Sequence, residues 1–135
     1  MKRLLAATVL SLGMALPAHA TEWMDCGDAE ETASIRVLLG AMEVIAVNTV
    51  EIEAKGRRWS TAGGEGVTRV TTGQAFETAE QVWIDVTDEA VNAIVARLRL
   101  FKASDDGEGV EPSQATAGTL AMPGIGVWAV SCSGP

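Results

Sequence analysis

The chain has 135 residues, a formal net charge of −8, two cysteines, one histidine and no tyrosine. Nucleic acids and anionic membrane surfaces carry negative charge, so an acidic chain of this kind is disfavoured as their partner. Its length suits one domain of ordinary size behind a short N-terminal segment.

Residues 1–20 have the three parts of a secretory signal peptide. Lys2 and Arg3 provide the positive start, residues 4–16 are apolar, and Ala18-His19-Ala20 places small residues at a cleavage site. The apolar run is shorter than the ~20 residues of a membrane span, and the residue directly after the cleavage site is Thr21, not a cysteine that could be lipidated. We therefore expect export, to the periplasm of a Gram-negative cell or to the exterior, with no membrane anchor after cleavage.

His19 is the only histidine and would be removed with this peptide. The mature chain would then lack the residue that Ser-His-Asp catalysis, His-ligated metal sites and histidine proton shuttles require. The sequence therefore predicts no cofactor and no metal site, and it favours a protein that is not an enzyme.

The first part of the mature chain predicts β-structure after a short lead-in. Residues 21–33 are acidic without a clean period, so we expect an extended or irregular lead-in, followed by a single β-rich domain over residues 34–135. Alternation of apolar and polar residues predicts a strand over 34–39. The β-branched stretch 43–54 predicts a second strand, and a tight turn at Lys55-Gly56 leads into a third over 57–61.

The middle of the chain contains the one expected helix. Strands are predicted over 67–72 and 82–86, the latter by clean alternation. Thr87 or Asp88 has the side chain of a helix N-cap, which predicts a helix of one to two turns near residues 88–94. A long strand ending near Lys102 is expected to follow.

The C-terminal part ends the pattern with an acidic loop over 103–113, a strand over 115–122, a Pro-Gly turn and a strand over 127–132. These elements predict a mainly β fold, namely a single-domain antiparallel β-sandwich or partly closed barrel of about seven to eight strands with one short helix. An α+β fold is the alternative.

Two cysteines in an exported chain favour one disulfide, between Cys26 and Cys132, over two free thiols. Trp128, Val130 and Cys132 share one strand face by the two-residue period. If that face is the core, a tryptophan packs near the disulfide.

Carboxylates provide two candidate sites. Asp85, Asp88 and Glu89 could perform acid and base chemistry in a hydrolase, although helix capping already explains the last two. The acidic loop holds Asp105, Asp106, Glu108 and Glu111, whose oxygens suit calcium but whose spacing does not match a calcium loop. Solvated loop charge is the favoured interpretation, and calcium binding stays open.

A glycine-rich loop at 63–66 lacks the Lys-Ser/Thr of a phosphate-binding loop and is interpreted as a flexible connection.

A basic and aromatic face is the main candidate for binding. It comprises Arg57, Arg58, Trp59, Arg97 and Arg99. Tryptophan and arginine dominate interface hot spots, and Arg97 and Arg99 point to the same side as Phe101. The structural alternative is that Arg97 and Arg99 form ion pairs with Glu51 or Glu53 on a neighbouring strand. Among the tryptophans, Trp23 and Trp59 are expected to be exposed.

The sequence thus predicts a small exported, periplasmic, non-enzymatic domain that binds another macromolecule, such as an envelope protein, or stabilises an envelope assembly. A carboxylate-dependent hydrolase and a carrier of a small apolar ligand inside a barrel are the alternatives. The sequence gives no indication of the oligomeric state.

Overall fold

The computed structural model describes residues 21–40 and 44–135, and it folds them into nine β-strands with no helix among them. The strands are β1 (Glu22–Gly27), β2 (Ala33–Gly40), β3 (Ala46–Ala54), β4 (Arg57–Ser60), β5 (Thr68–Glu77), β6 (Gln81–Asp88), β7 (Ile94–Asp105), β8 (Ser113–Met122) and β9 (Gly126–Ser133). Within these residues no helix has the length and apolar character of a membrane span. The predicted signal peptide lies outside the described residues.

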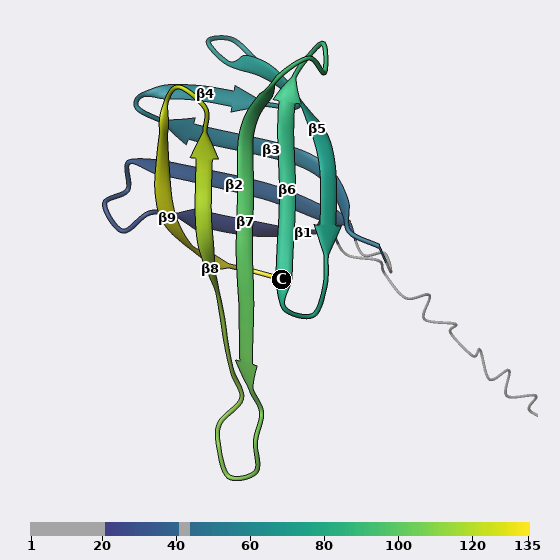
Figure 1. The fold of residues 1–135 in the computed structure, drawn as a ribbon, viewed down its shortest axis with the longest axis vertical. Coiled ribbons are helices and arrows are strands. Elements are labelled where there is room, and N and C mark those ends of the chain that lie inside the picture. The colour runs from purple at the N-terminus through teal and green to yellow at the C-terminus, as the bar shows by residue number, and fades with distance from the viewer. Residues whose placement is uncertain (1–20, 41–43) are drawn as a thin grey trace, which may run out of the picture.

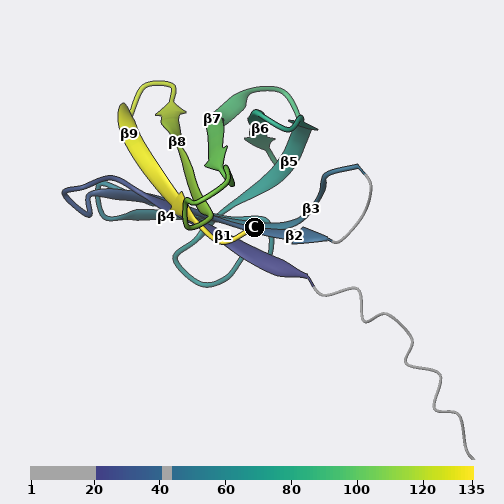
Figure 2. The same ribbon diagram turned by 90° about the horizontal axis from the view of Figure 1, so that it is seen from below.

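The strands pair in sequence order around a closed barrel. All neighbours are antiparallel except β4 and β5, whose parallel pairing joins only Trp59 to Thr68 and Ser60 to Arg69. β1 and β9 close the barrel through three residue pairs. In Figure 1, strands β1–β4 run behind strands β5–β9 and nearly perpendicular to them. In the view from below, β1–β4 form a flat layer and β5–β9 form an arched layer over it (Figure 2). The two shortest pairings therefore separate a β1–β4 layer from a β5–β9 layer.

Alternating side chains fill the space between these layers, as the two-residue period of a strand requires. On β6, for example, Val82, Ile84 and Val86 are buried while Trp83 is exposed. The buried core is almost wholly aliphatic, and Trp59 is its one aromatic side chain in the part of the chain that the structure describes. Neither phenylalanine contributes to it, which leaves both on the surface.

The predicted helix near residues 88–94 is wrong, because Asp88 ends β6, residues 89–93 form the hairpin loop and Ile94 begins β7. The backbone amide of Asp88 donates to the carbonyl of Ala93 at 2.9 Å, and the amide of Asn92 donates to the Asp88 carboxylate at 2.7 Å. An aspartate that accepts a bond from a nearby free amide serves a hairpin loop as well as a helix N-cap. The role expected of the Asp88 side chain is therefore present, but in another element.

The loop between β1 and β2 repeats this geometry. The amide of Asp28 donates to the carbonyl of Ala33 at 3.1 Å, and the amide of Thr32 donates to the Asp28 carboxylate at 2.8 Å. Each loop also has one residue with a positive φ at the equivalent position, Glu31 at 57° and Val91 at 59°. Two hairpins on opposite layers are thus closed by the same aspartate-centred turn.

The predicted disulfide is confirmed, since Cys26 of β1 is bonded to Cys132 of β9. The two cysteines are direct cross-strand partners, with Cα atoms 4.0 Å apart, at the middle of the three pairs that close the barrel. Val130 on the same face of β9 is buried and Trp128 is half-buried. The disulfide therefore reinforces a short closing pairing.

The mainly β prediction is confirmed, while its finer features differ. The structure is one closed barrel of nine strands, where a sandwich or a partly closed barrel of seven to eight was expected. Much of the expected lead-in over residues 21–33 belongs to β1, which pairs with both β2 and β9. β7 extends to Asp105, so β7 and β8 continue beyond the barrel body as a long hairpin (Figure 1).

Candidate functional site

The five residues of the predicted binding face lie on two different layers. Arg57, Arg58 and Trp59 belong to β4 in the flat layer, whereas Arg97 and Arg99 belong to β7 in the arched layer. Figure 2 shows the two layers facing each other, and the buried core side chains pack between them. The five residues therefore do not form one surface, and the two groups have to be considered separately.

Trp59 is not exposed as expected, since only 3% of its surface is accessible. It is the direct partner of Ile52 on β3, and this register turns both side chains into the barrel. The guanidinium carbon of Arg57 lies 4.9 Å from the centre of the Trp59 ring. Trp23 is half-buried, with the guanidinium of Arg36 stacked 4.6 Å from its ring. Neither tryptophan is available as an open contact on the β1–β4 layer.

Ion pairs occupy the outer face of that layer. Arg36 pairs with Asp25 at 2.5 Å and with Glu51 at 3.4 Å, while Arg58 pairs with Glu53 at 3.1 Å. The hydrogen bond from Arg36 to the Asp25 carboxylate raises the pKa of this arginine. Exposed pairs of this kind contribute little to stability, but they neutralise one another.

The expectation that Glu51 or Glu53 pairs with Arg97 or Arg99 is wrong. Both glutamates pair inside the β1–β4 layer, because β2 and β4 are the neighbours of β3. Arg99 instead finds its carboxylate on β6 of its own layer.

The β5–β9 layer carries an exposed cluster of aromatic and basic side chains, which we call the aromatic–arginine patch. It consists of Phe76 on β5, Trp83 on β6, and Arg97, Arg99 and Phe101 on β7. The exposed fractions are 52% for Phe76, 45% for Trp83 and 62% for Phe101. Phe76 and Trp83 are cross-strand partners whose rings meet edge to face at 6.1 Å. An edge-to-face contact of this kind stabilises the pair of rings beyond the effect of their mutual burial.

Arg99 is fixed in the centre of the patch. Its Nη2 donates to the Asp85 carboxylate at 2.6 Å, its Nη1 donates to the carbonyl of Leu98 at 2.9 Å, and its guanidinium carbon lies 5.2 Å from the Trp83 ring centre. β8 approaches this site closely, because a Cβ atom at Gly118 would overlap the carbonyl oxygen of Arg99. Arg99 and Trp83 are thus held in place by contacts within this layer.

The carboxylates of the hydrolase alternative do not converge. Asp85 is paired with Arg99, Asp88 accepts the amide of Asn92, and Glu89 lies 3.8 Å from Arg69. Each has a separate structural contact, whereas the two-carboxylate mechanism of glycoside hydrolysis needs a pair of carboxyl groups that face one substrate.

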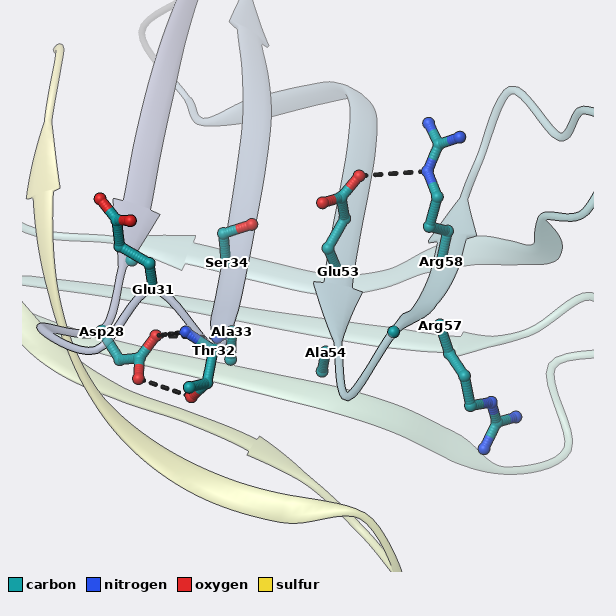
Figure 3. A pocket seen from close by; sticks show the side chains of 11 residues that line it. Asp28, Glu31, Thr32, Ala33, Ser34, Glu53, Ala54, Arg57 and Arg58 are labelled. Atoms are coloured by element: carbon teal, nitrogen blue, oxygen red, sulfur yellow. Dashed lines mark hydrogen bonds and ion pairs between the residues drawn. The ribbon is translucent and has the colours of Figure 1, made fainter.

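The β1–β4 layer carries a surface groove of about 380 Å³, which lies between the β1–β2 loop and the β3–β4 hairpin. In Figure 3, Asp28 turns toward Thr32 and Glu53 reaches Arg58, while Glu31, Ser34 and Arg57 have no marked contact with the other labelled residues. The Asp28 carboxylate accepts hydrogen bonds from the backbone amides of Ala33 and Thr32 and from the Thr32 hydroxyl. These bonds lower the pKa of Asp28, and the bond from the Ala33 amide has the largest effect. Two of the three carboxyl groups that line the groove, those of Asp28 and Glu53, are therefore already engaged.

The acidic loop and the glycine-rich loop show no arrangement of side chains typical of a ligand site. In the acidic loop, the Asp105 carboxylate accepts the amide of Gly107 at 3.0 Å. Across residues 21–40 and 44–135, no three His, Cys, Asp or Glu side chains are grouped as metal ligands would be. In the glycine-rich loop, Gly63, Gly64 and Gly66 have positive φ values, as a turning connection requires.

Sequence reasoning missed two members of the patch, although one could have been found. The alternation of Val82, Ile84 and Val86 places Trp83 on the outer face. The side chain of Phe76 follows a register shift between Thr72 and Ala75, so its facing could not be obtained by counting along the strand.

No family model, curated protein sequence or solved structure matches this chain. The geometry of the described residues is therefore what supports a function.

Proposed function

We propose that this chain is a small exported, periplasmic protein that is not an enzyme and that binds a protein of the cell envelope through the aromatic–arginine patch. The observation that carries the proposal is the placement of aromatic residues. The chain has only two phenylalanines, and both lie with Trp83 on the outer face of one layer. Exposed apolar clusters of this kind are typical of interaction sites.

The composition of the patch favours a protein as the partner. Tryptophan and arginine are enriched among the residues that contribute most to protein–protein binding, and charged side chains at the rim give orientation. Arg99 is already ordered by Asp85 and Trp83, so binding does not have to immobilise it. The intramolecular disulfide is compatible with an exported protein.

The two alternatives have less support. The separate contacts of Asp85, Asp88 and Glu89 leave a hydrolase without a paired acid and base. A carrier would hold its ligand inside the barrel, but packed aliphatic side chains of both layers fill that interior. The groove described above lies at the surface.

The test is affinity capture from envelope extract with the wild-type mature protein, a patch variant and a control variant. The Trp83→Ala/Phe101→Ser variant removes two exposed rings. The amount of the specific partner that it captures should fall at least about tenfold, as expected when two hot-spot residues are removed. The matched control is Val110→Ser, since Val110 is 51% exposed and lies in the β7–β8 loop away from the strands of the patch. Quantitative mass spectrometry of the captured proteins measures the ratio.

Equal recovery of every protein by the patch variant and by wild type would remove the patch as a binding site. Circular dichroism and a check for the disulfide establish whether the variant is folded, so that loss of a partner can be assigned to the changed surface.

A further inference from the structure

Arg97 is unusual among the basic residues that the structure describes. Five others pair with carboxylates, namely Arg36, Arg58, Arg69, Arg99 and Lys102. Lys55 donates to the carbonyl of Ile125 at 2.6 Å, and Arg57 stacks on Trp59. Arg97 has none of these contacts within the described residues.

The register explains why Arg97 forms no ion pair with the other described residues of its layer. Asp85 is its direct cross-strand partner, but the carboxylate turns along the strand to Arg99, which it meets at 2.6 Å. On its other side Arg97 faces Ala121 of β8, and Ala121 in turn faces Val127 of β9. These small and apolar neighbours leave the Arg97 guanidinium exposed and without an ion pair to any residue that the structure describes.

Arg97 also lies at the edge of a groove of about 460 Å³ at the β8–β9 turn. Apart from Arg97, the groove is lined by nonpolar side chains and glycine, among them Ala121, Met122, Ile125 and Val127. A cation beside a nonpolar groove matches a ligand that carries an anion next to an apolar group.

The turn that forms the groove is well fixed. The amide of Ile125 donates to the carbonyl of Met122 at 2.9 Å, and Gly124 between them has a φ of 77° after Pro123. This is the residue pattern of a tight turn with glycine at its third position. Lys55, from the β3–β4 hairpin, holds the outer carbonyl of Ile125. The groove is therefore largely formed before binding.

We propose that this groove binds a segment of a partner protein in which an aspartate or glutamate adjoins an apolar side chain. The carboxylate pairs with Arg97, the apolar side chain enters the groove, and the neighbouring residues of the partner rest on Phe101 and Trp83. The inference rests on the proposed function and specifies the chemistry of its partner. Because Arg97 and Phe101 lie on the same face of β7, one continuous surface can make both contacts.

The test uses the full exported protein in cells with a photo-crosslinking amino acid at position 127, at the groove, or at position 101, in the patch. The crosslinked partner is isolated, and the attached peptide is sequenced by mass spectrometry. We expect a crosslink from both positions to one protein, and a peptide at position 127 that contains Asp or Glu beside an apolar residue.

Charge reversal identifies the role of Arg97. Arg97→Glu should reduce the crosslink at position 127 at least about tenfold, as repulsion replaces an ion pair, while Arg97→Lys retains most of it. Arg57→Glu is the matched control, since it makes the same charge change on the other layer and should have no effect. Changing the identified acidic residue of the partner to Lys should restore the crosslink of the Arg97→Glu protein.

Crosslinks at position 101 without any at position 127 would overturn the groove proposal and leave the proposed function standing. Absence of crosslinks at both positions would overturn both. A glycan or lipid attached at position 127, or a crosslink that Arg97→Glu does not weaken, would also refute the groove proposal.

Discussion

Asp28 and Asp88 show how one side chain can determine a loop. Each carboxylate accepts the amide four residues later, and each backbone amide closes the loop by donating across it. Asp28 additionally accepts the hydroxyl of Thr32 at 2.7 Å and the amide of Ala33 at 2.8 Å. Hydrogen bonds of this kind favour the charged carboxylate, which is why the pKa of Asp28 is lower than its usual value of 3.8.

The stability of the barrel should therefore depend on the ionisation of Asp28. Because its folded pKa is depressed below 3.8, the carboxylate stabilises the folded state above that pH, and this contribution is lost as the pH falls through the folded pKa. Asp28→Ala should lower the melting temperature by a few degrees at neutral pH, and the difference from wild type should narrow below pH 3.8. Thermal unfolding by circular dichroism over a pH series measures this.

Asp106→Ala is the control, since Asp106 is an exposed loop carboxylate. If the Asp28→Ala difference is the same at low and neutral pH, the carboxylate has no role in closing the loop.

At the scale of elements, alternation predicted the strands that bury one face. Val82, Ile84 and Val86 on β6 follow the period, because the arched layer has one side in the core and one in solvent. The β6–β7 connection was not predictable in the same way. An aspartate before free amides satisfies a helix start and a hairpin loop equally, and the choice depends on pairing between β6 and β7 over seven residue pairs.

Long-range pairing also limited the prediction of the site. The face of Trp59 is set by its register with Ile52, whereas its sequence neighbours Arg57 and Arg58 suggested exposure. The arginines of β4 and β7 lie close to one another only if the strand order brings them together, and the barrel separates them into two layers. Of the predicted face, only the β7 half joins an exposed aromatic cluster.

The β6–β7 hairpin carries a local strain that can be relieved. Val91 has a φ of 59° and is 63% exposed, and a β-branched residue is disfavoured in this left-handed region. Val91→Asn should stabilise the barrel by about 1 kcal/mol, since asparagine tolerates the conformation. Equilibrium unfolding in guanidinium chloride measures the change.

Val110→Asn provides the comparison, because Val110 is also exposed but does not have a positive φ. Equal effects of the two substitutions would show that the gain has another cause.

At the scale of the molecule, two short strand pairings join the two layers of the barrel, and only one of them carries a covalent bond. β1 and β9 share three residue pairs and a disulfide, while β4 and β5 share two parallel pairs and no covalent link. A crosslink restricts the unfolded chain most when the loop that it closes is long. Cys26 and Cys132 are 106 positions apart, so the bond constrains almost the whole described chain.

Removing the disulfide should therefore cost about 2–5 kcal/mol of folding stability. The variant Cys26→Ala/Cys132→Ala avoids placing a polar group at Cys26, which is only 3% exposed. Guanidinium unfolding of the oxidised, reduced and doubly substituted proteins gives the difference. Coincident unfolding curves for the oxidised and reduced proteins would contradict a stabilising role.

The position of the disulfide has a consequence for biogenesis. β9 is the last strand in the sequence, yet it is the closing partner of β1, the first. A polypeptide that crosses a membrane N-terminus first would present Cys26 to the oxidising side long before Cys132 arrives. A chain interrupted ahead of β9 would lack the pairing that closes the barrel and would keep Cys26 as an unpaired thiol. The same bond that stabilises the molecule would thus mark its completion.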